Sequence, residues 1–215
     1  MRLARAAEEL GAEAEPCDVG DRAQVDAVAA RVAERHPAVH LLVNNAGIPG
    51  GGGFLDVEPE RVEAVTRTNY LGGVWCVRAF LPLLRRGAPA DVVNVASVAG
   101  TVVGPTSGPY AASKHAQVAF SRSLAAELRG SGIRVHLINP GPVPTPGFPQ
   151  RRALAGRVSR RLVVSPDDVA AAIVRALRAD RREVFVPSVY RLAAAAQGIA
   201  PGTLTRLAAL TRWGR

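Results

Sequence analysis

The chain has 215 residues, of which 48% are hydrophobic and 21% are charged, and its formal net charge is +9. This length and composition are typical of one globular domain with a buried core. The positive charge comes almost entirely from arginines spread along the chain, and no basic run is interleaved with aromatic residues. That pattern argues against a nucleic-acid-binding surface.

The cysteines and the apolar runs exclude further classes of protein. Cys17 and Cys76 have neither the spacing of a metal site nor that of a disulfide framework, so no metal is expected. No apolar run reaches the ~18 residues of a membrane span. The first five residues also lack the apolar core of a signal peptide. We therefore expect a cytoplasmic protein.

Hydrophobic periodicity predicts helices and strands that alternate along the chain. A first helix is expected to end at Gly11, followed by a short strand over residues 12–17 and an acidic turn, Asp18-Val19-Gly20-Asp21. The later helices are expected over residues 25–35, 59–84, 110–129 and 166–179, and the later strands over residues 39–43, 91–97, 133–138 and 183–187. Two short helices broken at Pro201-Gly202 are expected to follow, over residues 192–213. This alternation predicts an α/β fold, a doubly wound parallel sheet with helices on both faces.

Polar or glycine residues come at the ends of three predicted strands. Asn45 follows one strand, Ser97 ends the next, and Pro140-Gly141 follows the third. In parallel sheets, ligands bind at the carboxyl ends of the strands. These residues are therefore candidates for one common site.

Tyr110 and Lys114 form the chemically most suggestive pair. They are four residues apart, so a helix places them on one face, and Lys114 is the only lysine of the chain. A free tyrosine titrates near ~10. A nearby cation favours the phenolate and lowers the pKa of the tyrosine. The pair suggests proton transfer by Tyr110.

Taken in order and spacing, these motifs resemble those of the short-chain dehydrogenase/reductase family, in its compact single-domain branch. The motifs that carry the resemblance are Asn44-Asn-Ala-Gly47, Asn69, Ser97, Tyr110-x-x-x-Lys114 and Pro140-Gly141. The resemblance implies a Rossmann-like sheet, an NAD or NADP cofactor, and hydride transfer between a secondary alcohol and a ketone. The sequence does not decide between NAD and NADP.

The resemblance also implies a role for each candidate residue. Tyr110 would be the general acid/base, and Ser97 would hydrogen-bond the same substrate oxygen. Lys114 would lower the pKa of Tyr110 and hold the nicotinamide ribose, and Asn69 would order a water joined to the lysine. The residues implied to contact the cofactor are Asp18, Val19, Asn45, Ala46, Gly47, Tyr110, Lys114, Pro140, Gly141, Val143 and Thr145.

The opening unit of that family is not recognisable here. We expect an N-terminally truncated sheet that lacks the first βαβ unit, with its first two strands and its glycine-rich turn. The glycines of Gly47-x-x-x-Gly51-x-Gly53 are similar to that turn in composition. However, the next helix is expected to begin only near Pro59, so no helix N-terminus directly follows these glycines. The alternatives are a fragment of a longer protein and a natural short form that binds cofactor weakly or not at all.

Residues 1–215 are expected to form one domain with a substrate lid over residues 142–165 and a helical tail over residues 189–215. The predicted lid is rich in arginine, with Arg151, Arg152, Arg157, Arg160 and Arg161. These side chains either attract an anionic substrate or form a solvated face. The tail has an apolar stripe, Leu204, Leu207, Leu210 and Trp213. Packing on the domain or a neighbouring subunit is the favoured role of this stripe, ahead of a membrane surface or an apolar substrate.

Three functions compete. The first is an oxidoreductase acting on a small-molecule alcohol or ketone, as a homodimer or homotetramer. The second is a truncated, catalytically impaired fragment or a non-catalytic interaction subunit. The third, a sugar-nucleotide epimerase of the extended branch, would need a longer substrate domain, and the Asn44–Gly47 motif argues against it.

Overall fold

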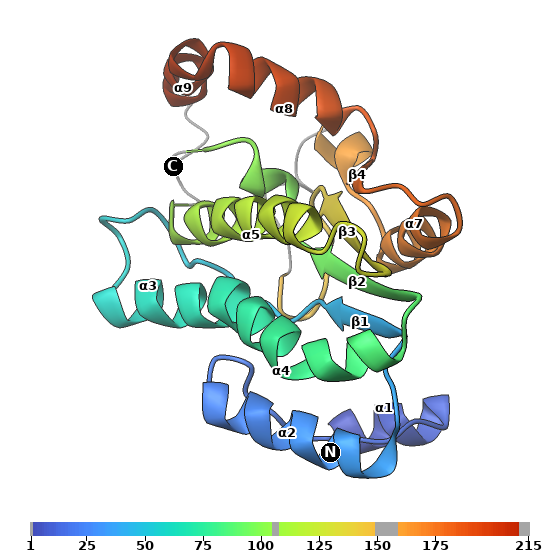
Figure 1. Ribbon diagram of the computed structural model, residues 1–215. Helices are drawn as coiled ribbons and strands as arrows, with labels where there is room; N and C mark the ends of the chain where they lie inside the picture. Colours follow the sequence, from blue (N-terminus) through green and yellow to red (C-terminus); the bar gives the residue numbers. More distant parts are fainter. Residues whose placement is uncertain (1, 105–107, 149–158, 211–215) are drawn as a thin grey trace.

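The computed structural model describes residues 2–104, 108–148 and 159–210 (Figure 1). At the centre of these residues lies a four-stranded sheet with the order β1-β2-β3-β4, in which every neighbouring pair is parallel. The strands are β1 (Leu41–Asn44), β2 (Ala90–Val95), β3 (Ile133–Pro140) and β4 (Glu183–Val186). The predicted α/β class with a parallel sheet is confirmed.

Helices connect the strands in the alternating order that the sequence predicts. They are α1 (Arg2–Leu10), α2 (Arg22–Arg35), α3 (Pro59–Thr66), α4 (Gly72–Arg86), α5 (Gly108–Glu127), α7 (Pro166–Arg178), α8 (Tyr190–Ile199) and α9 (Pro201–Leu210). The short helices are the π-helical turn η1 (Arg67–Leu71) and the 3-10 turns η2 (Val98–Gly100) and η3 (Ser159–Leu162). The single helix expected over residues 59–84 is thus three joined segments.

Each face of the sheet has its own apolar core. Helices α4 and α5 cover one face, through Val77, Leu84, Val92, Leu124, Leu128, Ile133 and Val135. Helix α7 covers the other face, through Val93, Val95, Ile138, Val164, Val169, Ala172, Ala176 and Val186. Helix α2 packs on α4 rather than on the sheet, with Val25 and Ala29 buried (Figure 1). The two cores fix β2 and β3 at the centre of the molecule.

On the face of the sheet that α7 covers, the apolar side chains of β1 are left exposed. Leu41 and Val43 pair in register with Asp91 and Val93, so their side chains point to the α7 side. Helix α7 contacts β3 and β4, and Leu41 and Val43 remain 45% and 42% exposed. Among the described residues, β1 has a strand neighbour on one side only.

The strand predicted over residues 12–17 is wrong. This segment forms no ladder and runs past α2, where the carboxylate of Glu15 pairs with Arg31 at 2.8 Å and also with Arg35. A strand needs a neighbour to satisfy its backbone groups, and the described chain supplies none on that side of β1.

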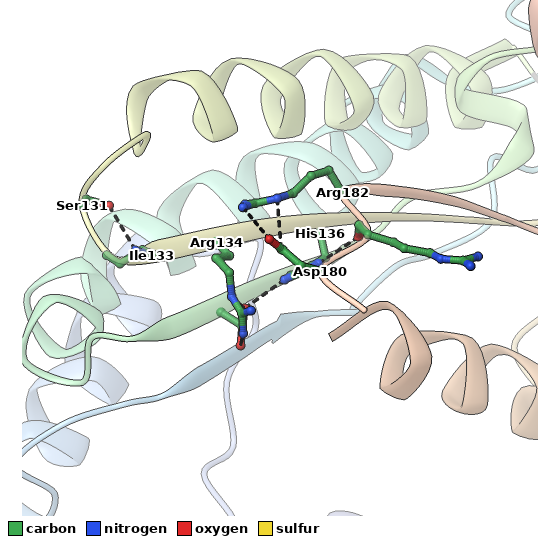
Figure 2. Close-up of polar contacts among 8 residues, drawn as sticks. Ser131, Ile133, Arg134, His136, Asp180 and Arg182 are labelled. Carbon is green, nitrogen blue, oxygen red and sulfur yellow. Dashed lines mark hydrogen bonds and ion pairs between the residues drawn. The ribbon is translucent and has the colours of Figure 1, made fainter. Parts of the chain in front are cut away.

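A cluster of charged side chains ties the strands together near their amino ends (Figure 2). The guanidinium of Arg134 donates to both carboxylate oxygens of Asp91, each over 2.8 Å. The fully buried His136 contacts the same carboxylate through Nε2 at 2.9 Å and the carbonyl oxygen of Arg181 through Nδ1 at 2.9 Å. The cluster joins β2, β3 and the turn before β4, far from the strand ends where ligands are expected.

The lid and the tail are described in part. Of the lid arginines, Arg151, Arg152 and Arg157 lie outside the described residues, as do the side chain of Arg160 and, in the tail, Trp213 and the side chains of Leu207 and Leu210. In the described part of the tail, α8 ends at Ile199 and α9 begins at Pro201. No helix in the described part of the chain has the length and apolar character to cross a membrane.

Candidate active site

The carboxyl ends of β1, β2 and β3 lie at one end of the sheet, and α5, which packs on one face of the sheet, contacts the turn η2 that follows β2. Turn η2 follows β2 and packs directly on α5: a Cβ at Gly100 would lie 2.7 Å from the carbonyl oxygen of Lys114. This close approach is possible because position 100 is glycine. It brings Ser97, at the start of η2, next to the first turn of α5.

Ser97 lies near enough to Tyr110 for its hydroxyl to lower the pKa of the phenol. The hydroxyl of Ser97 also accepts from the backbone N–H of Ala99 over 3.1 Å, and it donates to the carbonyl oxygen of Pro140 over 3.4 Å. Ser97 is therefore the N-cap of η2. The joint action of Ser97 and Tyr110 on one substrate oxygen stays a prediction.

The pKa of Tyr110 moves in the direction opposite to the one expected. Burial raises the pKa of the phenol, and the hydrogen bond from Ser97 opposes that rise without cancelling it. Lys114 is not among the causes of this shift, so its lowering of the Tyr110 pKa stays a prediction. The ammonium lies over the ring of Tyr110, 5.8 Å from its centroid, and its hydrogen bonds go to other groups.

Lys114 is buried, with 4% of its surface exposed. Its ammonium donates to the carbonyl oxygen of Val95 over 3.0 Å and to Oε1 of Gln117 over 2.9 Å. Burial lowers the pKa of Lys114 to about 8. With this pKa the lysine is mostly charged at neutral pH, and two acceptors hold its ammonium close to the end of β2.

Asn69 lies in the π-helical turn η1 and is 1% exposed, so it is not a surface residue. Its Nδ2 donates to the carbonyl oxygen of Ile48 over 3.0 Å and to the hydroxyl of Ser113 over 3.1 Å, and its Oδ1 accepts from the N–H of Ile48 over 2.8 Å. Such turns occur at functional sites. Here the turn lets Asn69 clamp the Asn44–Gly47 loop to α5.

Gly47 faces both Asn69 and the lysine. A Cβ at Gly47 would lie 3.4 Å from Oδ1 of Asn69 and 3.8 Å from Nζ of Lys114. Asn45 and Ala46 are exposed beside it. The site thus offers an open, small-residue edge of backbone next to a buried ammonium, which fits a dinucleotide cofactor that lies close to the loop.

The acidic turn lies further along the same edge. The carboxylate of Asp18 accepts from the backbone N–H of Gly20 over 2.8 Å and is exposed. Val19 is packed against the start of α4, where a Cβ at Gly72 would lie 2.9 Å from its methyl group. These contacts hold the turn against the helix that carries Asn69, but they do not bring Asp18 to Tyr110.

The segment after β3 returns to the tyrosine. The N–H of Gly141 donates to the carbonyl oxygen of Val186 over 2.8 Å, while the side chain of Val143 packs into the core under α7. Thr145 pairs with Phe148, and the ring of Phe148 lies 5.7 Å from the ring of Tyr110. Thr145 is therefore near the site through Phe148, whereas the side chain of Val143 points away from it.

Several buried polar residues of the site are absent from the set predicted by sequence. They are Asn44, Asn94, Ser113, Gln117 and Ser121, and each has a side-chain hydrogen bond inside the molecule. The sequence could have indicated Gln117 and Ser121, because positions 110, 114, 117 and 121 recur at helical spacing and so share one face of α5. A polar residue on the buried face of a helix is otherwise unusual.

In the described chain, no group of three or more histidine, cysteine, aspartate or glutamate side chains is arranged to hold a metal ion. The fold and site define a Rossmann-like class in which a tyrosine, a serine and a lysine meet at the strand ends. Residues 1–154 match the family of short chain dehydrogenases. The chain belongs to this family.

Relatives and solved structures agree with that assignment. The chain is 39% identical over 181 residues to the 1-deoxy-11-beta-hydroxypentalenate dehydrogenase of Streptomyces exfoliatus, covering 81% of this chain and 64% of that relative's length. A short chain dehydrogenase/reductase from Burkholderia phymatum, solved in complex with NAD, superposes with a TM-score of 0.79 at 28% identity, over 94% of this chain and 82% of the other. One from Burkholderia cenocepacia, in complex with NADP, has a TM-score of 0.74 at 26% identity, over 87% and 74%.

Proposed function

We propose that the chain is an NAD(P)-dependent oxidoreductase that interconverts a secondary alcohol and a ketone, with Tyr110 as the general acid/base. One observation carries the proposal: the buried ammonium of Lys114 lies 5.8 Å from the centroid of the Tyr110 ring, and Ser97 is near enough to the phenol to lower its pKa. Family membership and the NAD and NADP complexes of the two structural relatives support it.

The chemistry divides between cofactor and chain. When bound, NAD(P) supplies or accepts the hydride. In the reductive direction the hydroxyl of Tyr110 gives its proton to the substrate oxygen, and Ser97 donates a hydrogen bond that stabilises the charge developing there. The raised pKa of Tyr110 keeps the phenol protonated at neutral pH, which suits the acid of a reduction. In oxidation the same tyrosine takes the proton back.

The residues proposed to hold the cofactor divide between two ends of the strand edge. Lys114 and the Asn45–Gly47 loop would hold the nicotinamide half, and Asp18 with Val19 would lie beside the adenine. The remaining contacts would come from the segment after β3, through Pro140, Gly141, Val143 and Thr145, with Val143 contributing backbone because its side chain is in the core.

The test compares Tyr110→Phe with the native chain and with Tyr70→Phe, a matched control on η1 whose ring packs edge-on against Phe120. Tyr110→Phe is expected to lose about 10²–10⁴-fold in turnover, because general acid–base catalysis is worth that much. Titration with NADH and NADPH should show that cofactor affinity is largely intact in both variants. Substantial turnover by Tyr110→Phe contradicts the role, and a native chain that binds neither dinucleotide contradicts the proposed function.

A second function is favoured by a different observation. The face of β1 that α7 leaves bare, with Leu41 and Val43 exposed, suits a catalytically impaired form or a non-catalytic interaction subunit. The same titration separates the two, because only the enzyme must bind NAD(P)H. In either case we propose a cytoplasmic homodimer or homotetramer, and for the enzyme a small-molecule substrate.

A further inference from the structure

A stripe of polar side chains continues along α5 beyond Tyr110 and Lys114. Residues 110, 114, 117 and 121 are separated by four, three and four positions, so they share one face of the helix. Gln117 and Ser121 are 3% and 1% exposed, which places this face against the sheet. Polar side chains buried so completely need hydrogen-bond partners, and here these partners connect the helix to the strands.

Gln117 is the member of the stripe that touches the lysine. Its Oε1 accepts from Nζ of Lys114 over 2.9 Å, and the carbonyl oxygen of Val95 accepts from the same ammonium over 3.0 Å. An ammonium has only donors, so chemistry alone requires the oxygen of the amide, and not its nitrogen, to face it. Because both side chains are buried, water does not screen this contact.

The backbone of Gln117 is anchored separately. Its carbonyl oxygen accepts from the hydroxyl of Ser121 over 2.7 Å, and that hydroxyl accepts from Nδ2 of Asn94 over 2.9 Å. Oδ1 of Asn94 accepts in turn from Nδ2 of Asn44 over 2.8 Å. The position that holds the ammonium is thus itself tied to β2 and β1.

We propose that Gln117 is a positioning residue for Lys114, whose side-chain carbonyl keeps the buried ammonium charged and fixed at the end of β2 beside Tyr110. The inference rests on the proposed function only in that this function places Lys114 in the active site. A buried ammonium with too few acceptors is costly, and the neutral amine then becomes the favoured form. Without Gln117, the Val95 carbonyl would be the one remaining acceptor among the contacts that the structure gives for Nζ.

The test measures the pKa of Lys114 directly. Because Lys114 is the only lysine, growth on lysine labelled with ¹³C at Cε gives one side-chain resonance, and Lys114→Arg, which must abolish it, assigns it. Titration of this resonance is expected to give a pKa of about 8 in the native chain. Gln117→Met keeps the length of the side chain but removes the acceptor. It should lower the pKa of Lys114 by about one unit, the value of a hydrogen bond to a charged group.

Two further variants sharpen the result. Gln117→Glu keeps the shape and adds a negative charge, so it should raise the pKa of Lys114 above the native value. Ser121→Ala is the matched control, because it removes buried hydrogen bonds of the same stripe without touching the ammonium. It should leave the pKa of Lys114 unchanged.

The proposal is overturned if Gln117→Met has the native pKa, or if Ser121→Ala shifts the pKa of Lys114 as far as Gln117→Met does. If Gln117→Met does not fold, Gln117→Glu decides alone, and a pKa that fails to rise overturns the proposal. The samples contain neither NAD(P)H nor substrate. An inactive chain would therefore contradict the proposed function but would not affect the titration of Lys114. Conversely, a titration that overturns the role of Gln117 would not affect the proposed function.

Discussion

Lys114 is the residue at which function and stability oppose each other most clearly. An unperturbed lysine titrates near ~10.4, whereas burial lowers the pKa of Lys114 to about 8 in the folded chain. The folded state therefore carries the cost of a buried ammonium at neutral pH. Active sites often accept such a cost because a charge is needed there.

Lys114 is therefore predicted to make stability depend on pH above neutrality. Between about pH 8 and pH 10 the folded chain releases the Lys114 proton while the unfolded chain keeps it, so the contribution of Lys114 to the free energy of unfolding rises with pH. Lys114→Met lacks this rise. Its stability relative to the native chain should be most favourable at pH 7 and should fall by up to about 3 kcal/mol at pH 10. Urea denaturation at both values measures it, and an equal difference at the two values contradicts the prediction.

At the scale of elements, the contact between η2 and α5 sets the distance between Ser97 and Tyr110. Gly100 lies at this contact, and an added Cβ would lie 2.7 Å from the Lys114 carbonyl oxygen and 2.8 Å from a methyl group of Val118. The backbone of Lys114 and the packed side chain of Val118 cannot both move aside for this atom. Any larger residue must separate the turn from the helix.

Gly100→Ala is predicted to destabilise the chain by about 1–3 kcal/mol, as overpacking does. It should also reduce turnover, because Ser97 moves away from Tyr110. The matched control is Gly198→Ala on α8, where an added Cβ meets nothing within 4 Å. That change should be neutral or stabilise by up to about 1 kcal/mol, as alanine does in a helix. Thermal and urea unfolding compare the two, and equal effects would refute this account of the contact.

The strands are held at their amino ends by the Asp91 cluster. Burial would raise the pKa of Asp91, but the hydrogen bonds from Arg134 and His136 outweigh it, so the pKa of this carboxyl lies below its ordinary value. A depressed carboxyl pKa stabilises the fold above the unfolded value of about 3.9, and this contribution is lost as the pH falls through the folded value.

Asp91→Asn is predicted to lower the free energy of unfolding by about 2 kcal/mol at pH 7, because Arg134 and His136 lose a charged partner. The difference between variant and native chain should shrink below about pH 4, because the Asp91 carboxyl of the unfolded native chain takes up a proton there while the folded one, with its lowered pKa, still resists it. Denaturation curves at pH 7 and pH 3 measure it. A difference that stays constant would show that the ion pair is not its source.

At the scale of the whole molecule, the exposed apolar face of β1 is the feature with the largest consequence. Leu41 and Val43 are 45% and 42% exposed on a strand that has one neighbour in the described sheet. Edges of this kind favour association with another chain.

Val43→Lys is predicted to reduce self-association, because a charge on an edge strand disfavours pairing. Val103→Lys is the control, since Val103 is 42% exposed but lies outside the sheet. Sedimentation velocity over a range of protein concentrations measures the effect. A native chain that stays monomeric, or two variants that behave alike, would show that the edge of β1 does not drive association.

The alternation of helices and strands from β1 onward, the parallel sheet and the family could be predicted from the sequence, because these depend on local periodicity and on the spacing of motifs. The same periodicity places Ser97 at a strand end and Tyr110 on a helix face. The tertiary structure alone decided that residues 12–17 form no strand, that the pKa of Tyr110 rises, and that Gln117 holds Lys114. These three depend on burial and on partners supplied by distant segments, which no local pattern records.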